Sequence, residues 1–136
     1  MISVDTNVII SALNQKDINH ALARRILTQH NAERLVICPV VYAELMASPG
    51  EDGIRAFLDR ADIPTLQEMP LEVWEEAGTA FGRYATRRRK GRLPRRIIAD
   101  FIIAAHATYH KLKVLTFDTT IYKAVFHDLT VLETDI

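Results

Sequence analysis

Four acidic residues stand apart because each interrupts or ends a stretch that otherwise reads as apolar core. Three of them are the only charged residue within their stretch, and the fourth ends a stretch that is typical of a buried strand. They are Asp5 within 1–13, Glu44 within 35–47, Asp100 within 97–105, and Asp118 after 113–117. An isolated ionised carboxylate in apolar surroundings is unstable by several kcal/mol unless it is paired with a cation. These acids therefore need partners.

One partner could serve all four acids if the fold brings them together. Two unit charges about 4 Å apart repel by roughly 4 kcal/mol at an effective dielectric constant of 20, so a cluster needs raised pKa values or a cation. Ligands that are all oxygens favour Mg²⁺ or Mn²⁺ over zinc. Such an ion activates water and offsets charge at phosphorus, as in metal nucleases. Thr6, Asn7 and Thr116 add neutral oxygens that could support the ligands or orient water.

The alternative is that each acid is satisfied separately. Asp5 and Asp118 would then be turn or cap residues, and Asp100 would pair with Arg95 or Arg96. Asp5 and Asp118 both follow predicted parallel strands, which places them at one edge of a sheet. The interpretation in which the four acids share one cation is therefore the stronger one.

Short strands alternating with helices are the elements that must position the acids. Strands are predicted at 2–4, 35–38, 65–68, 114–116 and 130–132. Helices are predicted at 8–13, 17–30, 39–45, 51–61, 71–89 and 97–110, with one more short helix before the last strand. This alternation predicts an α/β sandwich around a mainly parallel sheet. Ligands of such sheets bind beyond the carboxyl ends of the strands.

The composition is that of an ordinary globular domain. The chain has 136 residues, of which 49% are hydrophobic and 25% charged, so we expect one domain over 1–136 and no disordered class. No apolar run approaches the roughly 20 residues that cross a bilayer, and no basic segment typical of a signal peptide opens the chain. The single cysteine, Cys38, cannot form an internal disulfide. These features favour a cytoplasmic protein without a membrane anchor.

The formal net charge is zero, but the basic residues are unevenly distributed. The segment 83–96 carries eight of the seventeen Lys and Arg residues and no acid. We call these eight the basic segment: Arg83, Arg87, Arg88, Arg89, Lys90, Arg92, Arg95 and Arg96. Such a run suits contact with RNA phosphates, which is independent of sequence and sensitive to salt. A solvated helix end, where cations complement the helix dipole, is the competing interpretation.

Other residues that could do chemistry are better explained by packing. His106 and His110 have the spacing of a zinc pair, but His106 lies about 240° around a helix from Asp100 and so points away from the acids. Cys38 has no matched histidine and is interpreted as a small core residue. The aromatic residues at helical spacing are likewise assigned to packing, with RNA stacking as the alternative: Trp74, Phe81 and Tyr84.

Four motifs occur in an order that resembles the PIN-domain ribonucleases, especially the VapC toxins of bacterial and archaeal toxin–antitoxin pairs. They are Asp5-Thr6-Asn7, the stretch 40–45 around Glu44, the stretch 99–107 around Asp100, and Leu115-Thr116-Phe117-Asp118. The resemblance covers essentially the whole chain. It implies that Asp5, Glu44, Asp100 and Asp118 are the acidic metal ligands, with Thr116 at a hydroxyl position of the family and Asn7 at its Ser/Asn position.

The resemblance also implies a fold and an activity. The fold is a three-layer α/β/α sandwich with a five-stranded, mainly parallel sheet. The activity is Mg²⁺-dependent endonucleolytic cleavage of RNA, often tRNA or ribosomal RNA, and the implied partners are a second copy of the chain in a homodimer and a cognate antitoxin. The chain departs from many relatives at Phe117, where they carry Arg, and at Ala99, where they carry Pro. Neither departure removes a ligand, although Phe117 weakens the case for a phosphate contact there.

Two other classes of function are weighed against the nuclease. A receiver-like signalling domain also gathers acids at strand ends. Such domains resemble one another in having two adjacent acids after the first strand, whereas here Asp5 is followed by Thr6 and Asn7. A catalytically inactive PIN-like module that binds RNA or protein is the second alternative. The presence of all four carboxylates argues against it.

Overall fold

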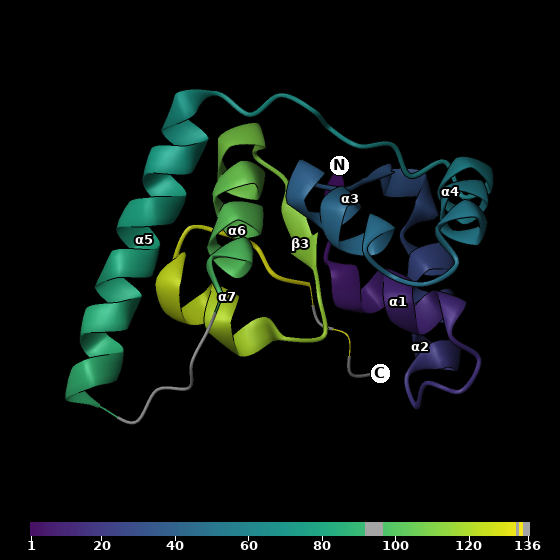
Figure 1. The fold of residues 1–136 in the computed structure, drawn as a ribbon, viewed down its shortest axis with the longest axis horizontal. Coiled ribbons are helices and arrows are strands. Elements are labelled where there is room, and N and C mark those ends of the chain that lie inside the picture. Colours follow the sequence, from purple (N-terminus) through teal and green to yellow (C-terminus); the bar gives the residue numbers. More distant parts are fainter. Residues whose placement is uncertain (92–96, 133, 135–136) are drawn as a thin grey trace.

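The computed structural model describes residues 1–91, 97–132 and 134, and the described part is an α/β fold. Its elements, labelled in Figure 1, are β1 (Ile2–Val4), α1 (Thr6–Leu13), α2 (His20–Gln29), the 3₁₀ turn η1 (Asn31–Glu33), β2 (Leu35–Val36), α3 (Pro39–Met46), α4 (Glu51–Arg60), α5 (Leu71–Lys90), α6 (Ile98–His110), β3 (Lys113–Leu115) and α7 (Thr119–Val125). Each predicted helix is present, with ends that differ by a few residues.

The strands pair in parallel in the order β2-β1-β3. Ile2 lies opposite Leu35 on one side and Lys113 on the other. Because β1 is central, all three of its residues are fully buried. The strands β2 and β3 flank β1 on opposite sides, so the chain moves one way across the sheet from β1 to β2 and the other way from β2 to β3. Because both connections are right-handed, their helices lie on opposite faces of the sheet. Accordingly, α1 and α2 lie on one side of β3 and α5 and α6 on the other (Figure 1).

The predicted parallel sheet is confirmed, but five strands is wrong for the residues described here. The segments expected to form the other two strands make one isolated parallel bridge each, Ile37 to Thr65 and Val114 to Val131. Pro64 has no backbone N–H to extend the first ladder. The sheet is therefore three strands wide with a bridge at each edge.

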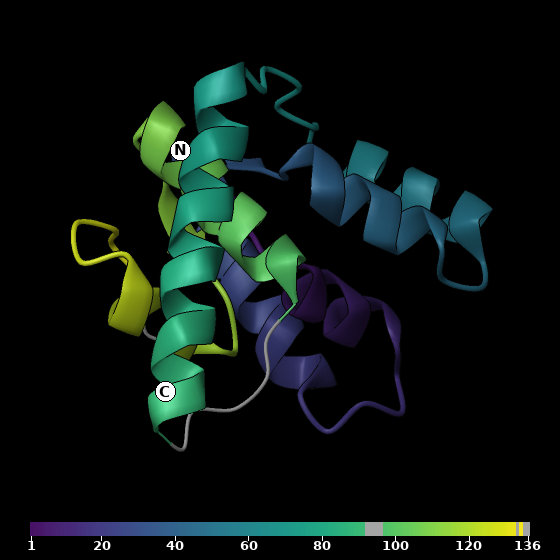
Figure 2. The same cartoon turned by 60° about the vertical axis from the view of Figure 1, so that its left-hand side comes forward.

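The long helix α5 packs along α6, and both views show the two side by side (Figures 1 and 2). Phe101 of α6 fills the contact between them, because its ring centroid lies 5.2 Å from that of Phe81 and 5.5 Å from that of Tyr84. The packing interpretation of Phe81 and Tyr84 is thus confirmed. Trp74, by contrast, is 48% exposed.

The helices α3 and α4 form a pair that reaches out from the side of the molecule (Figure 2). Gly50 begins α4 with a φ of +81°, a left-handed conformation that glycine adopts without strain. None of the helices in the described part of the chain combines the length and the hydropathy that a bilayer span requires.

His106 of α6 is a buried histidine whose ring holds the segment between α4 and α5. Its Nε2 lies 2.9 Å from the carbonyl oxygen of Leu66, to which it donates, while its Nδ1 has no partner among the described residues. Burial, together with the neighbouring His110, lowers the pKa of His106. His110 in turn donates from Nε2 to the carbonyl of Glu68 at 2.9 Å. Both rings thus bind backbone carbonyls.

We expect His106 to make the fold less stable in mild acid. Its folded pKa lies below the unfolded value of about 6.5, so the unfolded chain binds the extra proton first. The stabilisation is complete above pH 6.5 and is lost as the pH falls toward the folded pKa, at up to about 1.4 kcal/mol per pH unit. An NMR titration of the imidazole C–H resonances measures this, with the urea-unfolded chain as control. A native His106 that is protonated at the same pH as the unfolded chain would contradict the prediction.

Candidate functional site

The site begins at Asp5, where β1 ends and α1 begins. Asp5 occupies the N-cap position of α1, and its Oδ1 accepts a hydrogen bond of 2.7 Å from the Thr6 N–H. The carboxylate is only 6% exposed. It sits at the carboxyl end of the central strand, where the topology of a parallel sheet predicts a binding site.

Two hydroxyl groups hold the other oxygen of Asp5. Oδ2 accepts hydrogen bonds of 2.7 Å from Thr116 Oγ1 and 3.1 Å from the Tyr122 hydroxyl. Thr116 follows β3 and is fully buried. The carboxyl ends of β1 and β3 are thereby joined through side chains, as the sequence predicts.

Thr6 links Asp5 to the second acid. Its hydroxyl donates to Glu44 Oε1 at 2.7 Å, across 38 positions of sequence. Glu44 lies in α3, which begins with Pro39 in its first turn, a favoured position for proline. Thr6 thus contacts Asp5 through its backbone N–H and Glu44 through its hydroxyl.

Asn7 and Thr116 position the chain that carries Asp118. Thr116 Oγ1 accepts hydrogen bonds from the Asp118 N–H at 3.0 Å and from Asn7 Nδ2 at 3.4 Å. The Phe117 N–H donates to Asn7 Oδ1 at 3.3 Å. Asp118, half-buried, then occupies the N-cap position of α7.

Burial and mutual repulsion of the acids shape the electrostatics of the site. Burial is the main cause that raises the pKa of the Asp5 carboxyl, and the Glu44 carboxylate raises it further, while the hydrogen bonds from Thr116, Thr6 and Tyr122 oppose the shift. Burial is also the main cause that raises the pKa of the Tyr122 hydroxyl well above its usual value, and the negative charges of three carboxylates raise it further. Those carboxylates are Asp5, Asp100 and Asp118. All four predicted acids therefore act on one another or on Tyr122.

The donor set fits a hard cation, although the arrangement falls short of a complete ligand cage. The four predicted acids offer carboxylate oxygens, which Mg²⁺ and Mn²⁺ prefer. Asp5 is a buried carboxylate, and none of the described Lys, Arg or His side chains forms an ion pair with it. Within 1–91 and 97–132, however, no three His, Cys, Asp or Glu side chains form a group that could hold a metal ion as they lie. The chemistry of the donors supports a cation site whose remaining ligands would be water or substrate oxygens.

Tyr122 contacts the site although its sequence position did not single it out. It lies in α7, one helical turn after Asp118, and is 1% exposed. Residues four positions apart share one side of a helix, so this spacing from a predicted ligand is the signal that could have identified it.

The remaining predicted residues form none of the hydrogen bonds of the site described above, or lie outside the described part. Arg83, Arg87, Arg88, Arg89 and Lys90 are in the second half of α5, and Arg92, Arg95 and Arg96 lie outside the described residues. Cys38 is fully buried, and burial raises the pKa of its thiol to about 11, which fits a core residue rather than a nucleophile.

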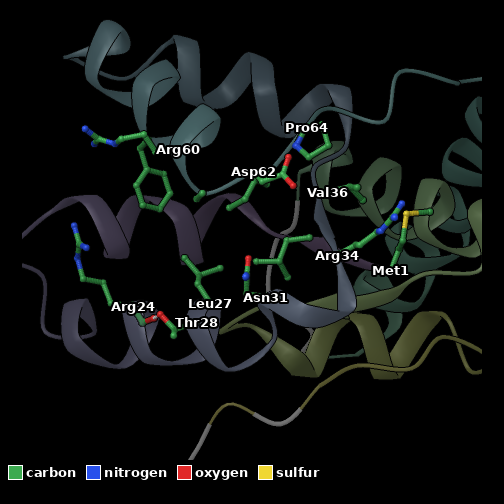
Figure 3. Close-up of a pocket in the computed structure, with 14 residues that line it drawn as sticks. Met1, Arg24, Leu27, Thr28, Asn31, Arg34, Val36, Arg60, Asp62 and Pro64 are labelled. Carbon is green, nitrogen blue, oxygen red and sulfur yellow. Dashed lines mark hydrogen bonds between the residues drawn. The ribbon is translucent and has the colours of Figure 1, made fainter.

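A separate pocket of about 760 Å³ opens at the other edge of the sheet (Figure 3). Its lining includes Met1 and Leu35, which stand at the amino ends of β1 and β2. Arg24 of α2 and Arg60 of α4 face each other across it (Figure 3). No acid of the site lines this pocket, so it belongs to a different surface.

Comparison with known proteins gives one matching family model and several solved structures with a similar fold. A family model described as the PIN domain matches residues 2–126. A search of curated proteins finds no match. Three similar solved structures are complexes whose chains resemble this one in fold. In VapBC2 from Rickettsia felis bound to a promoter DNA fragment, the matching chain has a TM-score of 0.65 and 18% identity, covering 99% of this chain and 100% of that one.

The other two give similar values. VapBC-1 from nontypeable Haemophilus influenzae matches with a TM-score of 0.64 and 22% identity, covering 98% of both chains. DNA-bound VapBC from Salmonella typhimurium matches with a TM-score of 0.67 and 17% identity, also covering 98% of both. At these identities the likeness is one of fold.

Proposed function

Because the chain belongs to the PIN domain family, we propose that it is a single-domain, metal-dependent endoribonuclease that acts as the toxin of a toxin–antitoxin pair. The observation that carries this proposal is Asp5, a buried carboxylate held by three hydrogen bonds and without a cationic side chain among its described partners. The fold neighbours support the toxin role, because they are VapBC complexes.

The proposed metal ligands are Asp5, Glu44, Asp100 and Asp118. A bound Mg²⁺ or Mn²⁺ would supply a Lewis acid that acidifies water and offsets the charge developing on the phosphate in the transition state. The protein's own contribution is orientation. Thr6 fixes Glu44, and Thr116 fixes Asp5 while accepting from the backbone N–H of Asp118.

The second half of α5 is proposed to hold the RNA backbone. Arg83, Arg87, Arg89 and Lys90 are exposed, and none of them pairs with a described acid. Cations there bind phosphate without reading sequence. We propose a cognate antitoxin and a second copy of the chain as protein partners. A small gene for a DNA-binding protein beside this one in its genome would support the antitoxin.

The proposal is tested by sequencing RNA 5′ ends after brief expression of the wild type, of Asp100→Asn and of Asp128→Asn. Asp128 is an exposed acid outside the site and provides a control with the same loss of charge. Discrete new ends should appear with the wild type and Asp128→Asn and be absent with Asp100→Asn. Identical ends with all three, or RNA binding without any cleavage, would refute the nuclease and leave an inactive binding module.

A further inference from the structure

The Tyr122 hydroxyl donates a hydrogen bond to the Asp5 carboxylate. Its oxygen lies 3.1 Å from Asp5 Oδ2, and the residue is 1% exposed. A phenol keeps its proton at neutral pH and can donate it to a carboxylate. Tyr122 is thus a fixed donor to one oxygen of one proposed ligand.

The hydrogen bonds of Asp5 can be counted atom by atom. An ionised carboxylate has about four lone-pair sites, two on each oxygen. Oδ2 accepts from Thr116 Oγ1 at 2.7 Å and from Tyr122, which uses both of its sites. Among the residues that the structure describes, the Thr6 N–H alone donates to Oδ1, at 2.7 Å, which leaves one site open there.

We propose that Tyr122 is a positioning residue which, together with Thr116, saturates Oδ2 of Asp5 so that only Oδ1 is offered to a divalent cation. This inference rests on the proposed function, because it assigns Asp5 as a ligand. Without the Tyr122 hydroxyl, one lone-pair site of Oδ2 becomes open, so a cation can bind at either oxygen. The binding geometry is then no longer set before the cation arrives.

The location of Tyr122 supports this role over a purely structural one. A buried phenol could have donated to any backbone carbonyl, yet it donates to the acid at the end of the central strand. It also lies one turn after Asp118, so α7 positions one proposed ligand and the group that orients another. Removing a group that orients a metal ligand typically weakens metal affinity about 10–100-fold.

The test is the affinity for Mn²⁺ itself, measured by electron paramagnetic resonance of the free ion, for the wild type and Tyr122→Phe. The variant keeps the buried ring and loses only the hydroxyl. We expect affinity to fall about 10–100-fold, with cleavage recovering as the Mn²⁺ concentration rises. Tyr109→Phe is the matched control, because it removes the same atom from a partly exposed residue at the far end of α6, and it should bind as the wild type does.

A second variant provides the same test if Tyr122→Phe does not fold. Thr116→Val removes the other donor to Oδ2 and should also weaken Mn²⁺ binding. Unchanged Mn²⁺ affinity in a folded Tyr122→Phe or in Thr116→Val, even with a lower melting temperature, would overturn the positioning role. If Asp5→Asn binds Mn²⁺ as tightly as the wild type, the proposed metal site itself fails, which is distinguishable from a failure confined to Tyr122.

Discussion

Asp5→Asn is expected to reduce RNA cleavage by about 1,000-fold or more while leaving the fold intact. Loss of the central ligand removes metal stabilisation of several kcal/mol, and about 4 kcal/mol corresponds to that factor. Asparagine has the shape of aspartate and can still accept from the Thr6 N–H, so α1 should keep its cap. The measurement is cleavage of a labelled RNA by purified protein, with circular dichroism as the check on folding.

The same variant should be more stable than the wild type in EDTA. The pKa of Asp5 is raised in the folded state, so the stability contributed by its proton is present at low pH and is lost as the pH rises. The metal-free fold therefore loses stability as this buried carboxylate ionises, and asparagine cannot ionise.

Added Mn²⁺ should reverse the order of stability. A ligand that binds only the native state stabilises it in proportion to the logarithm of its concentration over Kd. The wild type should gain melting temperature with Mn²⁺, and Asp5→Asn should not. A variant that cleaves RNA normally, or that gains as much stability from Mn²⁺ as the wild type, would contradict the assignment of Asp5.

Charge reversal of Arg87, Arg88 and Arg89 to Glu is expected to weaken RNA binding at least tenfold near 0.1 M salt, since about 1.4 kcal/mol is enough for a factor of ten. Each phosphate contact that is lost should reduce the slope of log affinity against log salt by about 0.7 for single-stranded RNA, so three contacts give about 2. Within the described part of the chain, the Arg87 and Arg89 side chains donate only long hydrogen bonds of 3.5 Å to Ala124 O and 3.4 Å to Thr86 Oγ1, and both are exposed. Their guanidinium groups are available to a ligand.

A control with the same change of charge separates a local patch from net charge. Arg24, Arg25 and Arg60 lie on α2 and α4, and their reversal to Glu changes the net charge equally. The α5 variant should lose affinity and the control should keep most of it. Equal losses would show that only net charge matters, and unchanged binding by the α5 variant would remove α5 from the RNA interface. Circular dichroism is needed here too, because cations in the last turn of α5 also stabilise the helix.

The sequence was sufficient for the parts of the fold that depend on local patterns. The lone acid after an apolar strand predicted the position of Asp5 at the end of β1, and parallel strands placed Thr116 beside it. The five-strand expectation failed where pairing depends on tertiary geometry. Thr65 makes only one bridge because Pro64 cannot donate to the ladder.

The spacing of Tyr122 from Asp118 could have drawn attention to it, but its contact with Asp5 could not be predicted from sequence because it depends on where α7 packs. As a pattern it is one aromatic residue in a short helix, which ordinarily indicates core. Only the packing of α7 at the end of β1 brings its hydroxyl to Asp5, 117 positions away. Contacts of this kind depend on the complete fold.

Diffraction at a wavelength where manganese scatters anomalously, from crystals grown with Mn²⁺, tests the central claim most directly. We expect an anomalous peak within about 2.5 Å of Asp5 Oδ1, with oxygens of other site acids or water completing the shell. A peak elsewhere, or none at Asp5 when Mn²⁺ supports cleavage in solution, would contradict the account.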